Sequence, residues 1–220
     1  MFHDRFEAGL LLAEALGSCS ADASLIAIPR GGIEVGYAVS RRLKLPLDII
    51  IPRKIVSPEN PELALGAMTL DGSIEINHEL VARLGLTESD IEELVGPVRS
   101  EIARRLRLYR GMRPNLRLEG REVILIDDGL ATGYTMIAAI KSVSRERPRR
   151  LVVAVPVGPA STCEHLRSMV DDVVVLHEAH EACFAVSSLY RNFRDLPDEE
   201  LVKLLHDRTL PAQKSAQSIS

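Results

Sequence analysis

Two adjacent carboxylates, Asp127 and Asp128, are the residues of this sequence best placed to do chemistry. They end an apolar run over residues 123–126, and a turn rich in glycine and threonine follows them. An apolar run that leads directly into a polar turn predicts a buried parallel strand, and the residues from Met136 onward predict a helix. Carboxylates at the end of such a strand can accept hydrogen bonds from the hydroxyls of a sugar or bind a metal ion.

The turn after the two aspartates has the composition of an anion-binding loop. Its glycines let the backbone approach a ligand, its threonines add hydroxyl donors, and the helix N-terminus that follows offers free N–H groups to a phosphate. A ribose 5-phosphate satisfies both parts, with its phosphate in the loop and its diol on the aspartates. The competing interpretation is an ordinary strand–turn–helix with an aspartate as helix cap. The loop residues expected to bind the sugar phosphate are Gly129, Leu130, Ala131, Thr132, Gly133, Tyr134 and Thr135.

Two further strand ends carry positively charged side chains. Residues 24–29 and 47–51 each predict a short buried strand, and each strand runs into a basic junction. Glycines at the first junction can present N–H groups to an anion, although a tight turn alone would also require them. In a mostly parallel sheet these junctions should converge with the aspartates on one cleft. The junction residues are Arg30, Gly31, Gly32, Arg53 and Lys54.

The order of the elements predicts an α/β fold. Strands alternate with helices, which indicates three layers (α/β/α) around a mostly parallel sheet of five to six strands. Residues 55–65 predict a loop, and Asp71-Gly72 predicts the turn of a hairpin that follows it. The chain of 220 residues suffices for one well-buried domain over residues 1–206, and we expect a disordered polar tail over 207–220.

Composition limits the classes of function. The net charge of −4 does not indicate binding to nucleic acid or membranes, and no apolar stretch is long enough to span a bilayer. The N-terminus lacks the pattern of a signal peptide. An odd number of cysteines without zinc-type spacing indicates reduced thiols in a cytoplasmic protein. These cysteines are Cys19, Cys163 and Cys183.

Two segments leave alternatives open. Residues 99–121 contain eight arginines, which favours a solvated amphipathic helix but also allows a surface for nucleic acid or another partner. Residues 177–183 read HEAHEAC. The spacing of His177 and His180 would allow a metal site on a helix, whereas the position after a strand favours a plain loop.

Residues 123–135 resemble the phosphoribosyl diphosphate signature of type I phosphoribosyltransferases: an apolar strand, two acids, two variable residues, then Thr/Ala-Thr-Gly-x-Thr. The order of IPRGG, PRKI, NPELALGAM, LVVAVPV and FAVSSLYRNFRDL extends the resemblance over about residues 1–206, to a bacterial and archaeal group without a firmly assigned acceptor. The resemblance implies transfer of a phosphoribosyl group from 5-phosphoribosyl 1-diphosphate to a nitrogenous acceptor (a nucleobase or related amine), with release of diphosphate. It further implies Mg²⁺ as cofactor and a homodimer.

The resemblance also implies roles for segments and residues. The loop at residues 30–32 would hold the diphosphate, often through a non-proline cis peptide; residues 55–76 would form a mobile loop; and residues 177–206 would form a hood over the acceptor. By position, Phe184 would stack on the acceptor ring and Arg194 would meet the diphosphate. The implied catalytic residues are Arg30, Asp127 and Asp128, and the implied Mg²⁺ ligands are Asp127, Asp128 and Asp195.

Two departures from the purine enzymes of this family leave the acceptor and any general base unassigned. Ala131 stands where those enzymes have a proton-transferring aspartate, and the strand LVVAVPVGP lacks the lysine that they direct at the purine. Two rival functions remain. One is a non-catalytic regulatory protein that senses phosphoribosyl diphosphate and binds nucleic acid, and the other is a hydrolase or phosphorylase of a ribosyl phosphate.

Overall fold

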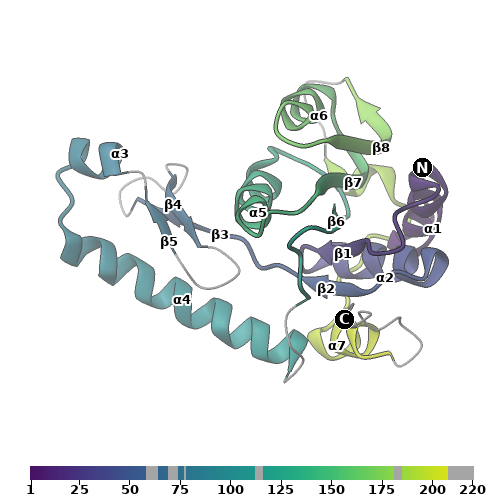
Figure 1. Cartoon of the computed structure of the whole chain (residues 1–220), viewed down its shortest axis with the longest axis horizontal. Coiled ribbons are helices and arrows are strands. Elements are labelled where there is room, and N and C mark those ends of the chain that lie inside the picture. The colour runs from purple at the N-terminus through teal and green to yellow at the C-terminus, as the bar shows by residue number, and fades with distance from the viewer. Residues whose placement is uncertain (58–63, 69–73, 77, 112–115, 181–184, 208–220) are drawn as a thin grey trace, which may run out of the picture.

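A five-stranded parallel sheet forms the centre of the computed structural model, with strand order β2-β1-β6-β7-β8 (Figure 1). The structure describes residues 1–57, 64–68, 74–76, 78–111, 116–180 and 185–207. The strands of the central sheet are β1 (Ser24–Ala27), β2 (Leu47–Ile49), β6 (Glu122–Ile126), β7 (Arg150–Pro159) and β8 (Asp172–Ala179).

The middle strands are buried on both faces, as their continuous apolar sequences predict. Every residue of β6 is buried. At its carboxyl end Ile126 pairs with Ala27 of β1 and Ala154 of β7, so these strands bring their following loops to one edge of the sheet. The junction at Arg30 and the two aspartates therefore lie on the same edge, as predicted.

Helices cover both faces of the central sheet and give the predicted three layers (Figure 1). On one face, α1 and α2 pack against side chains such as Leu25 and Ile124. On the other face, α5 and α6 pack against Leu125 and Val153, because successive residues of a strand point to opposite faces. In the described residues of the main body, the helices and a 3₁₀ turn are α1 (Arg5–Leu16), α2 (Gly31–Leu43), α5 (Tyr134–Arg145), α6 (Ala160–Arg167), η1 (Val186–Leu189) and α7 (Asp198–Leu205).

A second, antiparallel sheet with order β3-β4-β5 extends from the main body together with two helices (Figure 1). The predicted hairpin is confirmed by the pairing of β4 with β5. The loop predicted over residues 55–65 is wrong at both ends, because Ile55 and Leu65 lie in paired strands and are buried. The elements of this part are β3 (Arg53–Val56), β4 (Ala64–Met68), β5 (Ile74–Ile76), α3 (His78–Arg83) and α4 (Glu88–Arg110).

The boundaries of two other predicted segments also change. Residues 177–179, which were assigned to the hood, complete β8, because this strand continues to pair with β7 as far as Ala179. His177 is therefore neither helical nor in a loop. Among the residues that the structure describes, no group of three or more His, Cys, Asp and Glu side chains is arranged to hold a metal ion. Phe184 and Cys183 lie outside the described residues.

No helix in the described part of the chain has the length and apolar character needed to cross a membrane. Of the described cysteines, Cys19 and Cys163 are free thiols.

A buried ion pair fastens the end of α4 to the central sheet. The guanidinium of Arg110 donates from Nε to Asp48 Oδ1 and from Nη2 to the carbonyl of Ile49, both at 2.9 Å. The two charged side chains are only 8% and 11% exposed. The second carboxylate oxygen of Asp48 accepts from the backbone N–H of Leu116 at 3.1 Å. This pair therefore joins α4, β2 and the segment that leads to β6.

Removal of Arg110 should destabilise the fold strongly. Arg110→Ala leaves the carboxylate of Asp48 buried without its cation, which costs about 3 kcal/mol. Thermal unfolding followed by circular dichroism should show a melting temperature lower by roughly 6–12 °C. The control is Arg41→Ala, because Arg41 is 46% exposed and lies 3.5 Å from Asp207 in a surface pair worth less than about 1 kcal/mol. Equal losses of melting temperature for the two variants would contradict the stabilising role of the buried Arg110–Asp48 pair.

Candidate active site

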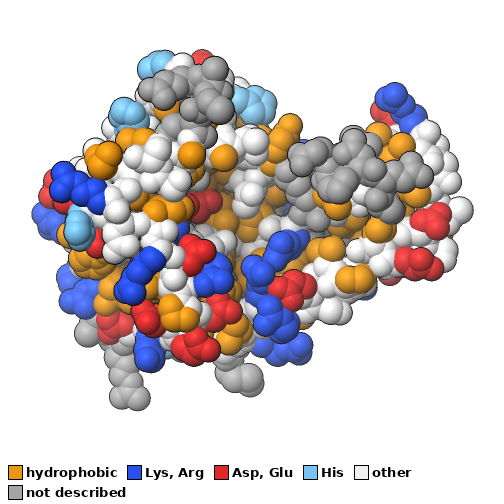
Figure 2. Space-filling model, turned by 180° about the vertical axis from the view of Figure 1, so that it is seen from behind, with side chains coloured by type: hydrophobic (Ala, Val, Ile, Leu, Met, Phe, Trp, Pro, Cys, Tyr) orange, Lys and Arg blue, Asp and Glu red, His pale blue; other side chains and the backbone are white. Residues whose placement is uncertain are grey.

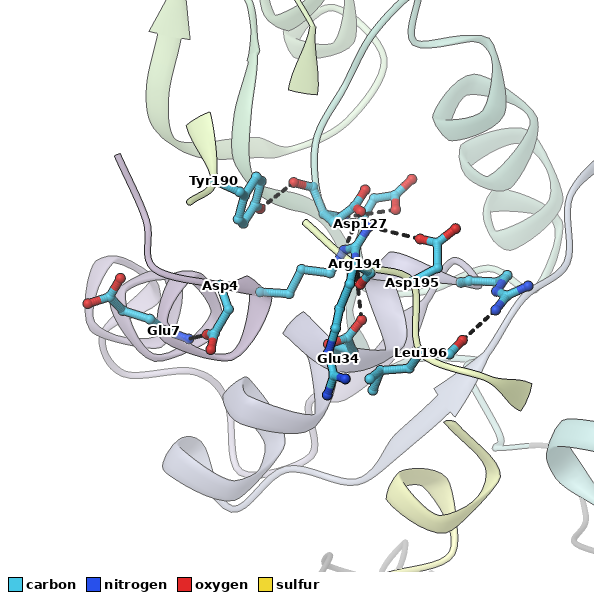
Figure 3. Close-up of polar contacts among 11 residues, drawn as sticks. Asp4, Glu7, Glu34, Asp127, Tyr190, Arg194, Asp195 and Leu196 are labelled. Carbon is cyan, nitrogen blue, oxygen red and sulfur yellow. Dashed lines mark hydrogen bonds and ion pairs between the residues drawn. The ribbon is translucent and has the colours of Figure 1, made fainter. Parts of the chain in front are cut away.

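Asp127, labelled in Figure 3, and Asp128 lie directly after β6, at the carboxyl edge of the central sheet. A buried arginine holds Asp128. Nε of Arg5 donates to Asp128 Oδ2 at 2.7 Å, and the Arg5 side chain is only 4% exposed. Arg5 is the first residue of α1. Sequence analysis missed it because its partner is 123 positions away and no motif marks it.

The guanidinium of Arg5 joins three parts of the chain. Its Nη1 donates to the carbonyl of Arg194 at 2.7 Å and to Glu34 Oε1, on α2, at 3.3 Å. Its Nη2 donates to Asp195 Oδ1 at 3.3 Å. The guanidinium carbon lies 3.9 Å from the centre of the Phe193 ring. Arg5 thus connects α1, α2 and residues 193–195 to the end of β6.

The aspartate pair carries more negative charge than Arg5 can neutralise. Burial, and next the charge of Asp128, raise the pKa of Asp127 well above its ordinary value. Burial also raises the pKa of Asp128, while the charge and hydrogen bond of Arg5 oppose that rise. Burial acts against the charge of Arg5, but Asp128, Glu34 and Asp195 more than offset this effect and raise its pKa. One described cation thus faces four carboxylates, so this site favours a further cation or hydroxyl donors.

The loop after β1 approaches the aspartates so closely that it requires glycine. A Cβ atom on Gly31 would lie 1.9 Å from Asp128 Oδ2, and one on Gly32 would lie 2.7 Å from the carbonyl oxygen of Ile126. The peptide bond between Pro29 and Arg30 is cis, as the family resemblance implies. These glycines therefore have a steric role in placing the start of α2 beside the carboxylates.

The basic residues that were predicted to bind the diphosphate contact other parts of the chain in this structure. Arg30 donates to the carbonyl of Leu196, which Figure 3 labels. It also lies 4.0 Å from Asp198.

Arg53 opens β3 in the second sheet, 4.0 Å from Glu101 of α4, instead of lying at the edge of the central sheet. Lys54 follows it in β3, and only its backbone is described. Arg194 is exposed and contributes its carbonyl to Arg5. Contact of these residues with the diphosphate stays a prediction.

The loop between β6 and α5 is anchored at its start and open at its end. Leu130 is buried, and its N–H donates to the carbonyl of Val157 at 2.8 Å. A Cβ atom on Gly129 would lie 2.5 Å from Val186 Cγ1. Gly133 has φ = +76° and precedes the first turn of α5. The exposed side chains of the open part are those of Ala131, Thr132, Tyr134 and Thr135.

A buried tyrosine contacts the main chain of the aspartate pair, whereas Arg5 contacts a side chain. The hydroxyl of Tyr190 donates to the main-chain carbonyl of Asp128 at 2.6 Å, and its ring packs on Phe2 and Phe193 with centroid distances of 5.4 and 5.0 Å. Burial, and next the charge of Asp128, raise the pKa of Tyr190, so it stays a neutral donor. From the sequence, Tyr190 is expected within the hood, and no local pattern indicates this contact.

The arginine-rich segment is partly neutralised within the chain. Arg104 and Arg105 donate to Glu101 at 2.8 and 2.6 Å, and these hydrogen bonds lower the pKa of Glu101 to about 2. Figure 2 shows basic side chains gathered along the part of α4 that borders a hollow, with acidic side chains among them, and the basic residues of α4 are all arginines. These pairs agree with the interpretation of a solvated amphipathic helix.

Residues 11–191 match the family model described as "Phosphoribosyl transferase domain". The chain therefore belongs to the phosphoribosyl transferase domain family, and the family and α/β fold predicted from the sequence are confirmed.

Two relatives extend this result. "Putative phosphoribosyl transferase Rv0571c" of Mycobacterium tuberculosis (strain ATCC 25618 / H37Rv) is 35% identical over 206 residues, which are 93% of this chain and 46% of that protein. The chain thus spans about half the length of the curated relatives it matches. The crystal structure of TT1426 from Thermus thermophilus is similar to this chain with a TM-score of 0.82 and 38% identity, over 93% of this chain and 97% of that one.

Replacement of Asp127 by asparagine should stabilise the metal-free protein. The raised pKa of Asp127 means that the unfolded chain loses its proton first as the pH rises above the ordinary value of 3.8, so ionisation costs stability at neutral pH. Asp127→Asn removes this cost, and each kcal/mol gained raises the melting temperature by about 2–4 °C. In EDTA, the gain should be largest near pH 8 and shrink towards pH 4.

The matched control for this measurement is Asp172→Asn. Asp172 is 48% exposed at the start of β8 and pairs with Arg150 at 2.9 Å, so its replacement should change stability by less than about 1 kcal/mol at any of these pH values. The prediction is contradicted if Asp127→Asn melts at a lower temperature than the unaltered protein at pH 8. In that case the charge of Asp127 stabilises the fold.

Proposed function

We propose that this protein transfers a phosphoribosyl group from 5-phosphoribosyl 1-diphosphate to a nitrogenous acceptor and releases diphosphate. The observation that carries the proposal is the acidic pair Asp127–Asp128 beside an open loop and a helix N-terminus at the carboxyl edge of a parallel sheet. Membership of the phosphoribosyl transferase domain family supports this reaction class.

The donor would bind through two kinds of contact, with hydrogen-bond acceptors at its ribose and hydrogen-bond donors at its phosphate. The two carboxylates would accept hydrogen bonds from the ribose hydroxyls. The 5-phosphate would meet the free N–H groups at the start of α5 and the hydroxyls of Thr132 and Thr135, whose side chains are exposed. The positive φ of Gly133 turns the chain into this helix without a side chain on the turn.

The residues present fit a divalent cation that is shared with the donor. Mg²⁺ commonly binds to one or two carboxylates together with substrate phosphates and waters, so it does not need a cage of protein ligands. The excess of four carboxylates over one arginine provides the charge for it. Asp127 and Asp128 would bind the ion directly and the exposed Asp195 would contact it through water; when bound, the ion neutralises charge that develops on the leaving diphosphate.

The protein's own donors would stabilise the same leaving group. Backbone N–H groups of Gly31 and Gly32 open α2, and the helix dipole there favours an anion. Arg30 would reach the diphosphate by exchanging its contact with the Leu196 carbonyl. The sugar would gain positive character as the bond to diphosphate breaks, and the aspartates would stabilise it. Arg53, Lys54 and Arg194 are further candidates, and Phe184 would stack on the acceptor ring.

The acceptor would be a nitrogen nucleophile. Two features of the site argue against a purine. Ala131 is exposed at the open part of the loop and has no proton to transfer. Strand β7 presents no lysine. A nucleobase or related amine that needs no acid at this position is therefore the better candidate.

Loss of the Asp128 charge should abolish donor binding. Asp128→Asn keeps a side-chain oxygen for Arg5 but removes the charge that the ribose and Mg²⁺ require, so calorimetry with phosphoribosyl diphosphate and Mg²⁺ should show affinity weaker by about 100-fold or more. Circular dichroism should show an intact fold. Asp172→Asn, at the opposite edge of the sheet, should bind normally. Unchanged affinity of the Asp128→Asn protein would refute this donor site.

A screen of nucleobases and small amines for diphosphate release tests the reaction itself. Transfer requires that release depends on the acceptor and that a ribosylated product forms. Release with the donor alone, in water, would instead identify a hydrolase.

A further inference from the structure

We propose that Arg5 is a positioning residue of the transferase. Its buried guanidinium holds the carboxylate of Asp128 in place and ties residues 193–195 to the donor site. This inference rests on the proposed function, and it assigns a role to α1, which the reaction scheme above does not use.

The contacts of Arg5 fix the orientation of its guanidinium. Four hydrogen bonds use Nε, Nη1 and Nη2, so most of the five N–H donors are engaged. The partners come from the end of β6, from α2 and from residues 194–195, which approach from different directions. The aromatic ring of Phe193 covers one face of the group. A planar fork with such partners has little freedom to turn.

This arrangement orients Asp128 from two sides. Arg5 binds Oδ2 of the carboxylate, and Tyr190 binds the main-chain carbonyl of the same residue. A Cβ atom on Gly31 would lie 2.8 Å from Nε of Arg5, so the donor-side loop packs directly on this contact. Arg5 does not use the second carboxylate oxygen, Oδ1. Arg5 itself is 4% exposed and acts through Asp128.

The N-terminal segment also holds the C-terminal one. The N–H of Phe2 donates to the carbonyl of Leu189 at 2.7 Å, and the carbonyls of Phe2 and His3 accept from Arg191 and Asn192 at 2.9 Å each. Residues 2–3 thus form a short ladder with residues 189–192, and Arg5 extends it by its bonds to residues 194 and 195. Through this ladder, the segment expected to cover the acceptor has its position set relative to the acidic pair.

Arg5→Ala and Arg5→Lys test the role. Calorimetry with Mg²⁺ and phosphoribosyl diphosphate should show donor affinity weaker by roughly 10- to 100-fold for Arg5→Ala, the loss typical when a supporting hydrogen-bond partner is removed. Arg5→Lys should show a smaller loss, because lysine keeps the charge but cannot bridge three partners. Added ethylguanidinium, which fits the space left by the deleted side chain, should restore binding to Arg5→Ala without affecting the unaltered protein.

Arg110→Ala is the matched control. Arg110 forms the same kind of buried pair with an aspartate and a main-chain carbonyl, but on β2. It should lose stability while its folded form keeps normal donor affinity. An equal loss of affinity in both alanine variants would reduce the Arg5 effect to general destabilisation and overturn the inference.

The outcomes separate the two proposals. If the unaltered protein does not bind the donor, the proposed function fails. If it binds and folded Arg5→Ala binds equally well, only the inference about Arg5 fails. Should Arg5→Ala not fold, Arg5→Lys decides: unaltered donor affinity in that variant would overturn the need for the guanidinium fork.

Discussion

The ion pair between Arg5 and Asp128 is the contact on which the rest of the site depends. Two charges at these levels of exposure, 4% and 17%, are costly unless well-directed hydrogen bonds compensate them. The guanidinium meets this condition because Glu34, Asp195 and the carbonyl of Arg194 take three of its four remaining donors. This one group contacts α2, the C-terminal segment and the end of β6, and the glycine loop packs against it. It therefore fixes the position of α1 relative to all of them.

The same cluster explains why the site favours its proposed ligand but lowers the stability of the free protein. Asp127 has no ion pair of its own among the described contacts, and its carboxylate accepts from the N–H of Asp128 at 2.9 Å. Such a group disfavours its own charge until hydroxyls or a metal ion arrive. Stability and binding are therefore opposed at this position, as is common where a protein keeps polar groups ready for a ligand.

Local signals predicted much of the fold, and contacts between distant residues account for what was missed. The apolar run of β6 and the Asp71-Gly72 signal for the hairpin of β4 and β5 are both visible in short stretches of sequence. Strand β3 depends on pairing with β4 across a proline-rich connection, so its last two residues, Ile55 and Val56, were assigned to a loop. Arg5 is recognisable only once partners 123 and 190 positions away lie beside it.

Gly31 changes how related sequences should be interpreted. A glycine in a phosphate-binding loop is usually taken as a mark of activity, because it lets the backbone approach the ligand. Here the atoms that exclude a side chain at Gly31 belong to Asp128 and Arg5. A descendant that had lost its substrate but kept this ion pair would still need the glycine. The glycine thus reports how the chain packs, and the evidence for retained catalysis in a homologue must come from the acids and the open loop.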